Sequence, residues 1–132
     1  MKELRVVCNR IIPFPGFSAM MLFGIIFRRK EYCKTPIKKT TMNHEGIHYV
    51  QALDFVGGIE KLSWLGFICF YIWYLTEWLI KLIMSIFTLC KIKSYKSISF
   101  EQEAYKNQYN YEYQETRKRF SWLKYVFKTV EK

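Results

Sequence analysis

The sequence predicts an α+β fold in which a small β-sheet of two to three strands packs on a mainly helical core. Short apolar segments rich in β-branched residues lie in the first thirty positions, where proline and glycine separate them. Pro36 is the last proline, and no glycine follows Gly66, so long helices are favoured beyond these points. With 132 residues and 51% hydrophobic content, the chain is expected to form one domain over residues 1–132.

The strands are expected between residues 5 and 29. Residues 5–12 (RVVCNRII) predict one strand, which Pro13 ends. Residues 19–29 contain two apolar runs on either side of Gly24, and they fit either one kinked strand or two strands joined by a tight turn. The sheet therefore has two or three strands.

The first helix is expected over residues 42–55. Thr40 or Thr41 can cap its start, and the glycine pair at 57 and 58 can end it. Both histidines of the chain lie in this helix, at His44 and His48, in the sequence HEGIH.

This pattern favours a metal site. A spacing of four residues places both imidazoles on one face of a helix, where they can bind one ion. In zinc-dependent hydrolases with this pattern, the acidic residue after the first histidine is the general base. The sequence therefore predicts zinc as the cofactor, His44 and His48 as its ligands, and Glu45 as the catalytic residue.

A third protein ligand is expected, and it must be a carboxylate because the chain has no third histidine or suitably spaced cysteine. A third helix is predicted over residues 99–119, opening with a capping box at Ser99. Glu103 lies one turn into this helix and is the preferred ligand, since polar residues follow it at helical spacing. Glu101 and Glu77 stay open as alternatives, although the helix dipole explains the first and a salt bridge explains the second.

The segments NHEGIHYVQ, at 43–51, and FEQEAY, at 100–105, resemble the gluzincin branch of zinc metallopeptidases. The likeness is to minimal single-domain gluzincins, to the core of HtpX-like membrane peptidases and to small uncharacterised bacterial proteins with the same order of motifs. It implies a zincin-like core and a sheet whose edge strand holds extended substrate. It also implies that a glutamate on a later helix, often followed by alanine as in Glu103-Ala104, completes the zinc site.

Between these helices, residues 60–90 predict an apolar helix that contacts a membrane surface. Charges are sparse after position 61, where only Glu77 and Lys81 occur before position 91. Three tryptophans lie within this helix: Trp64, Trp73 and Trp78. We expect the helix to lie along the membrane, because a crossing would separate Glu103 from the two histidines.

The charge balance favours an anionic partner. The chain has 21 lysines and arginines against 11 acidic residues, a net charge of +10. The basic residues are scattered along the chain and do not line one helix face, which argues against nucleic acid. Four cysteines without a C-x-x-C pair indicate four reduced thiols in a reducing compartment, and hence the cytoplasmic side of the membrane.

Together these patterns indicate a membrane-associated zinc metallopeptidase that hydrolyses peptide or protein substrates. The alternative is a non-catalytic, zinc-containing module that binds a membrane surface or another protein.

Overall fold

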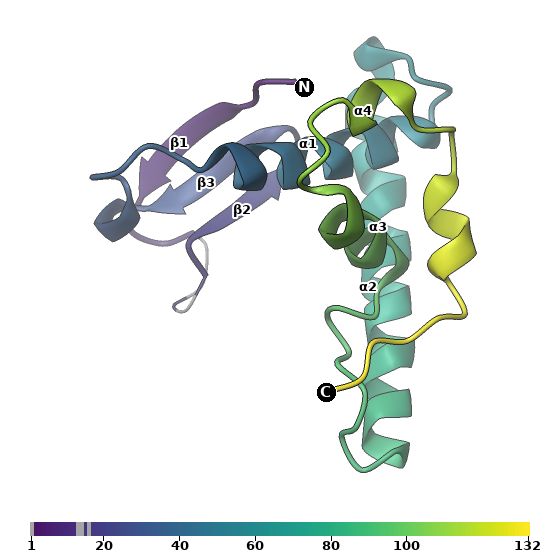
Figure 1. Ribbon diagram of the computed structural model, residues 1–132. Helices are drawn as coiled ribbons and strands as arrows, with labels where there is room; N and C mark the ends of the chain where they lie inside the picture. The colour runs from purple at the N-terminus through teal and green to yellow at the C-terminus, as the bar shows by residue number, and fades with distance from the viewer. Residues whose placement is uncertain (1, 13–14, 16) are drawn as a thin grey trace.

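The sheet of the computed structural model has three strands, β1 (Arg5–Asn9), β2 (Ala19–Leu22) and β3 (Ile25–Arg29), in the order β1-β3-β2 (Figure 1). The structure describes residues 2–12, 15 and 17–132. β1 runs parallel to β3, and β2 runs antiparallel to it. The α+β class and the small sheet are thus confirmed, and the segment around Gly24 is two strands joined by a tight turn.

β1 is shorter than predicted because Asn9 turns the chain. Its side-chain oxygen accepts a hydrogen bond from the backbone N–H of Ile11 at 2.8 Å, and its amide nitrogen donates to the carbonyl of Ile12 at 2.8 Å. Residues 10–12 therefore leave the strand direction. The predicted proline stop at 13 lies outside the described residues.

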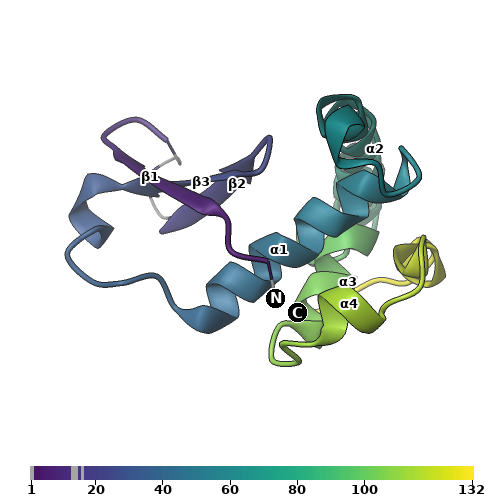
Figure 2. The same ribbon diagram turned by 90° about the horizontal axis from the view of Figure 1, so that it is seen from above.

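Helix α1 (Lys39–Asp54) runs between the sheet on one side and the long helix α2 (Ser63–Phe87) on the other (Figure 2). It begins at Lys39 with Lys38 as its N-cap and no side-chain cap, so the predicted threonine cap is wrong. It ends as predicted, because Gly57 and Gly58 adopt positive φ angles of 68° and 80°.

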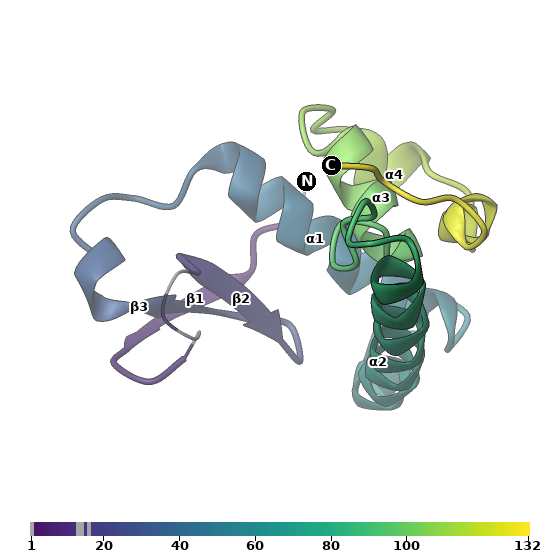
Figure 3. The same cartoon turned by 90° about the horizontal axis from the view of Figure 1, so that it is seen from below.

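α1 and α2 cross closely at Gly66. A Cβ atom there would lie 2.4 Å from the carbonyl oxygen of Ala52 on α1, so only glycine permits this approach. Viewed from below, α2 is seen nearly end-on, with the sheet at the far end of α1 (Figure 3). The core fills the space around this crossing with side chains from both helices and the sheet, among them Ile26, Ala52, Phe67 and Phe70.

The predicted helix over residues 99–119 is two helices, α3 (Ser99–Asn107) and α4 (Tyr113–Thr116). The chain turns between them because Asn43 on α1 donates hydrogen bonds to two carbonyls of the turn, of Gln108 at 2.8 Å and of Asn110 at 3.1 Å. The uninterrupted helix is therefore a wrong prediction.

The predicted capping box at the start of α3 is also wrong. The carboxylate of Glu77, on α2, accepts hydrogen bonds from the backbone N–H of Ser99 at 2.8 Å and from its hydroxyl at 2.6 Å. Gln102 donates instead to the carbonyl of Ser97 at 2.7 Å. The Glu77–Lys81 pair expected on α2 is present at 3.9 Å, but the stronger contacts of Glu77 are those to Ser99.

The C-terminal segment packs along the second half of α2 (Figure 1). The ammonium of Lys81 donates hydrogen bonds to the carbonyl oxygens of Val126 at 2.8 Å and Lys128 at 2.6 Å. The hydroxyl of Ser85 donates to the carbonyl oxygen of Ile92 at 2.8 Å. Glu77, Lys81 and Ser85, three polar residues of α2, thus face protein.

The expectation of four reduced cysteines is wrong for two of them. Cys8 on β1 and Cys33, which follows the short 3-10 helix η1 (Lys30–Tyr32), form a disulfide. Cys69 is a half-buried free thiol and Cys90 an exposed one. The predicted location on the cytoplasmic side of the membrane stays a prediction, without the support of four reduced thiols.

Candidate metal centre

The two histidines lie one turn apart on α1 and point to the same side. Both are buried, with 7% of His44 and 5% of His48 exposed. Their Nε2 atoms are 3.2 Å apart. The spacing of four residues thus brings the two ring nitrogens together, as predicted.

Glu101, in the first turn of α3, is the carboxylate that meets them. One of its oxygens lies 3.2 Å from Nε2 of His44, and the other lies 3.3 Å from Nε2 of His48. One donor atom from each of these three side chains falls within 4.8 Å of the other two. Among the described residues, this is the group with the composition and convergence of a metal site.

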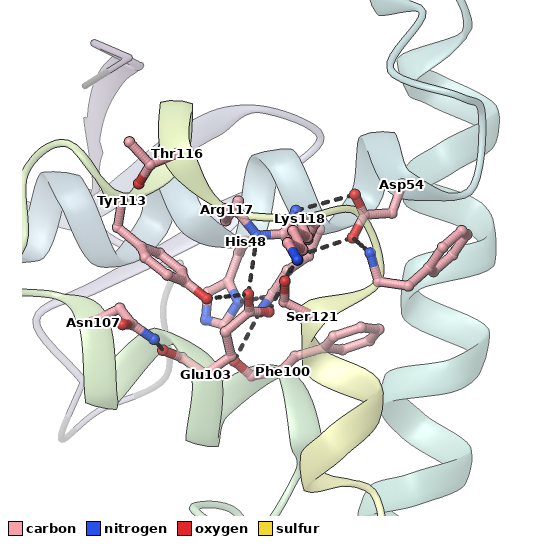
Figure 4. Close-up of polar contacts among 12 residues, drawn as sticks. His48, Asp54, Phe100, Glu103, Asn107, Tyr113, Thr116, Arg117, Lys118 and Ser121 are labelled. Carbon is pink, nitrogen blue, oxygen red and sulfur yellow. Dashed lines mark hydrogen bonds and ion pairs between the residues drawn. The ribbon is translucent and has the colours of Figure 1, made fainter.

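Glu103, the ligand preferred from sequence, does not join this group. Its carboxylate is fully buried and accepts hydrogen bonds from the Tyr113 hydroxyl at 2.9 Å and from Nε of Arg117 at 2.9 Å. Figure 4 shows this carboxylate next to Tyr113 and Arg117, with Asp54 bound to the same guanidinium. On a helix with about 3.6 residues per turn, residues two apart face nearly opposite sides, so only one of Glu101 and Glu103 can face the histidines.

Glu77, the other alternative, lies outside the group because its carboxylate caps α3. The structure thus brings together His44, His48 and one of the two alternative glutamates, and it separates Glu103 and Glu77 from them.

Two glutamines fix the outer nitrogens of the imidazoles. Nδ1 of His48 lies 2.7 Å from Oε1 of Gln51, and Nδ1 of His44 lies 3.1 Å from Oε1 of Gln108. The amide nitrogen of Gln51 donates to Glu103 at 2.8 Å and to the carbonyl of Phe100 at 3.0 Å, which sets the orientation of that amide. A carbonyl oxygen accepts, so each Nδ1 carries a proton, and in the neutral imidazole each Nε2 then presents its lone pair to the centre.

Two imidazole nitrogens and a carboxylate thus point at one another, and a cation between them is needed to balance these acceptor atoms. Burial by itself raises the pKa of Glu101, but the two histidines outweigh it and hold that pKa well below its usual range. Burial lowers the pKa of His48, yet the nearby charge of Glu101 and its hydrogen bond raise it to about 9. The hydroxyl of Tyr74 donates to Glu101 at 2.9 Å and holds the carboxylate in place. Either a proton or a metal ion satisfies this arrangement.

Glu45 lies at the edge of the centre and lines two adjoining cavities. The larger, of about 410 Å³, lies between β2 and α2, and His48 and Glu101 also line it. The smaller, of about 260 Å³, is lined by Glu45 and His44. Burial raises the pKa of Glu45, while the two histidines lower it, and the net pKa is raised. A carboxylate with a raised pKa beside a metal site is suited to general base catalysis.

Sequence reasoning missed Gln51, Gln108 and Tyr74. Gln51 had a signal, because a residue three positions after His48 lies on the same face of the helix. The other two carry no such signal, since each reaches the centre from another part of the fold.

The chain matches no model of a known protein family, no curated protein sequence and no solved structure. The geometry of the centre is therefore the basis for assigning a function.

Proposed function

We propose that the protein is a zinc-dependent peptidase in which His44, His48 and Glu101 hold the metal and Glu45 is the general base. One observation carries this proposal. Three buried acceptor atoms converge on one point while both outer imidazole nitrogens are held by amide oxygens. A buried arrangement of this kind, left without a cation, is costly.

The donor set fits zinc. Two imidazole nitrogens and one carboxylate oxygen are the ligands of many catalytic zinc sites, in which the fourth position stays open. In such sites the histidine nitrogen that does not bind the metal is hydrogen-bonded to another protein group, which orients the ring, and here amide oxygens contact the Nδ1 atoms. When bound, zinc supplies Lewis acidity toward a carbonyl group and toward water.

The residues of the chain account for the remaining requirements. Glu45 takes a proton from the attacking water and returns it to the leaving amine. Tyr74, Gln51 and Gln108 keep the ligands in place, which limits reorganisation during the reaction. β2 is an edge strand of the sheet and borders the larger cavity, so an extended peptide could pair with its outer edge.

Metal analysis combined with a peptidase assay tests the proposal. We expect about one zinc per chain in the wild type, strong loss of zinc in Glu101→Gln, and retention in the exposed control Glu112→Gln. Glu45→Gln should keep the metal and lose roughly 100-fold or more of the activity, because it removes the proton acceptor and spares the ligands. Near-stoichiometric zinc in a His44→Ala, His48→Ala double variant would refute the site. Zinc without hydrolysis in the wild type would favour the non-catalytic module.

We also propose that α2 attaches the protein to a membrane surface. The stretch Glu60–Phe87 is long and apolar enough to cross a membrane, and 22% of its most apolar part is buried. Large apolar side chains on this helix are exposed, including Trp64 at 57%, Ile72 at 64% and Phe87 at 83%. An apolar surface of this extent is typical of a membrane or protein interface.

Contacts on the other side of α2 favour attachment along the surface over a crossing. Non-helical backbone from residues 91–98 and 126–132 packs on its second half, together with the exposed lysines Lys91, Lys93 and Lys128. In a crossing, these charges would lie at the depth of the hydrocarbon, which is costly. Lysines beside an apolar face also favour anionic lipids.

Tryptophan fluorescence with vesicles tests the attachment. Vesicles containing anionic lipid should shift the emission to the blue more than neutral vesicles, and added salt should weaken the binding. Cysteines are introduced at Thr41 and Ser94 in a protein whose free thiols are removed by Cys69→Ser and Cys90→Ser, and an impermeant thiol reagent should label both on the same side of intact vesicles. Labelling on opposite sides would refute attachment along the surface.

A further inference from the structure

The larger cavity beside the metal centre is apolar over most of its wall. On one side it is bordered by β2, through Met20, Met21 and Leu22. On the other side it is bordered by aromatic residues of α2, among them Phe70 and Tyr71. Three ionisable residues at or beside the candidate metal centre also line this cavity: Glu45, His48 and Glu101.

Two residues of this lining also belong to the exposed apolar face of α2. Leu75 is 61% exposed and Trp78 is 36% exposed, yet both line the cavity. The cavity therefore opens onto the same face that we propose to lie against the membrane. Its volume of about 410 Å³ falls at the low end of the range of about 300–1,000 Å³ that is typical of ligand sites.

We infer that this cavity is the specificity pocket for a large apolar side chain of an extended peptide segment that lies at the membrane surface. The inference rests on the proposed function and names its class of substrate. The segment pairs with the edge strand β2, which brings its backbone past Glu45 and the two histidines. Alternate side chains of a paired strand point to one face, so one of them enters the cavity.

The chemistry of the wall excludes the other classes of side chain. An acidic side chain would meet the carboxylates of Glu45 and Glu101, and His48, the basic side chain of the described lining, is already paired with Glu101 at 3.3 Å. A lysine or arginine would lose its hydration among Met20, Phe70 and Trp78. A large apolar side chain instead gains by leaving water, and more so than alanine because it removes more apolar surface from water.

The first test uses internally quenched soluble peptides that are identical except at one position beside the scissile bond, which carries Phe, Leu, Ala, Asp or Lys. We expect kcat/KM for the Phe and Leu peptides to exceed that for Ala by at least about tenfold, with Asp and Lys lower still. Equal values for Phe and Asp would overturn the inference.

Two variants of α2 distinguish substrate binding in the cavity from attachment to the membrane. Leu75→Glu places a carboxylate at the mouth of the cavity and should lower kcat/KM for the soluble Phe peptide by about tenfold or more. Leu79→Glu is the matched control, because Leu79 is 52% exposed on the same helix and does not line the cavity. It should leave the soluble peptide unaffected and slow cleavage only of the same peptide anchored in anionic vesicles. Equal effects of both variants on the soluble peptide would overturn the inference.

A binding measurement distinguishes failure of this inference from failure of the proposed function. Labelled Phe and Asp peptides are titrated into the zinc-loaded Glu45→Gln protein, and fluorescence anisotropy is recorded. Preferential binding of the Phe peptide, abolished by adding Leu75→Glu, would support the pocket even if the wild type hydrolyses nothing. A fluorescent fatty acid that binds more tightly than the Phe peptide, with the same sensitivity to Leu75→Glu, would overturn it by showing that the cavity holds a lipid chain.

Discussion

Replacing Arg117 with methionine should destabilise the protein by about 3–5 kcal/mol. The guanidinium donates to both oxygens of Asp54 at 3.0 Å and to both oxygens of Glu103 at 2.9 and 3.2 Å. The side chains of all three residues are at most 6% exposed. Methionine has a similar length but leaves two buried carboxylates without a cation, so the loss falls in the range measured for broken buried ion pairs.

Urea unfolding followed by circular dichroism, with all proteins in the same detergent, measures this loss. Arg119→Met is the matched control, since the guanidinium of Arg119 is exposed and donates to the carbonyl of Gly57. It should change stability by less than about 0.5 kcal/mol. Adding Glu103→Gln to Arg117→Met should recover part of the loss because one unpaired charge is removed. A loss below about 1 kcal/mol for Arg117→Met would refute the reasoning about this buried network.

Three further predictions concern the rest of the fold. Gly66→Ala should lower the free energy of unfolding by about 1–3 kcal/mol in the same assay, because its Cβ would lie 2.4 Å from the Ala52 carbonyl oxygen. An unchanged unfolding midpoint would contradict the close crossing. Burial raises the pKa of Tyr71 to about 12, so the stability that it contributes is present below pH 10 and lost as pH rises through about 12. Unfolding at pH 9, 10 and 11 should therefore show a smaller decline for Tyr71→Phe than for the wild type, and equal declines would count against this. Alkylation of the unfolded, unreduced protein should modify two thiols, Cys69 and Cys90, and mass spectrometry that finds four would exclude the disulfide.

The paired histidines were predictable because a helix fixes the relation between residues four apart. His44, Glu45 and His48 needed only the local geometry of α1, and the glycines at its end defined that helix well. The strand pair around Gly24 was one of two alternatives that the sequence left open, since a tight turn is a local feature but a kinked strand has the same pattern.

The proposed third ligand was not predictable in this way because it depends on which face of α3 meets α1. Glu101 and Glu103 point to different sides, and the choice between them is made by tertiary contacts: Glu77 holds the start of α3, and Arg117 holds Glu103. The sequence suggests neither contact, because Ser99 looks like its own cap and Arg117 looks like a surface residue.

The disulfide was also not predictable from local sequence, because it depends on the topology of the sheet. β1 pairs with β3 so that Cys8 lies opposite Arg28, and the chain then turns after Arg29 through η1. This path returns Cys33 to the end of β1. The two cysteines are 25 positions apart in the sequence, and the segment between them contains no signal for that parallel pairing.

The carboxylate that caps α3 belongs to α2, and this couples the two helices mechanically. Glu77 holds the backbone and the hydroxyl of Ser99, and Glu101 follows two residues later. If α2 attaches the protein to a bilayer as we propose, a tilt of this helix would be passed on through Glu77 and Ser99 to Glu101, the side chain that faces the histidines. The lipid composition of the membrane would then alter how Glu101 meets the two histidines of the candidate metal centre, with Glu77 as the contact between the helices.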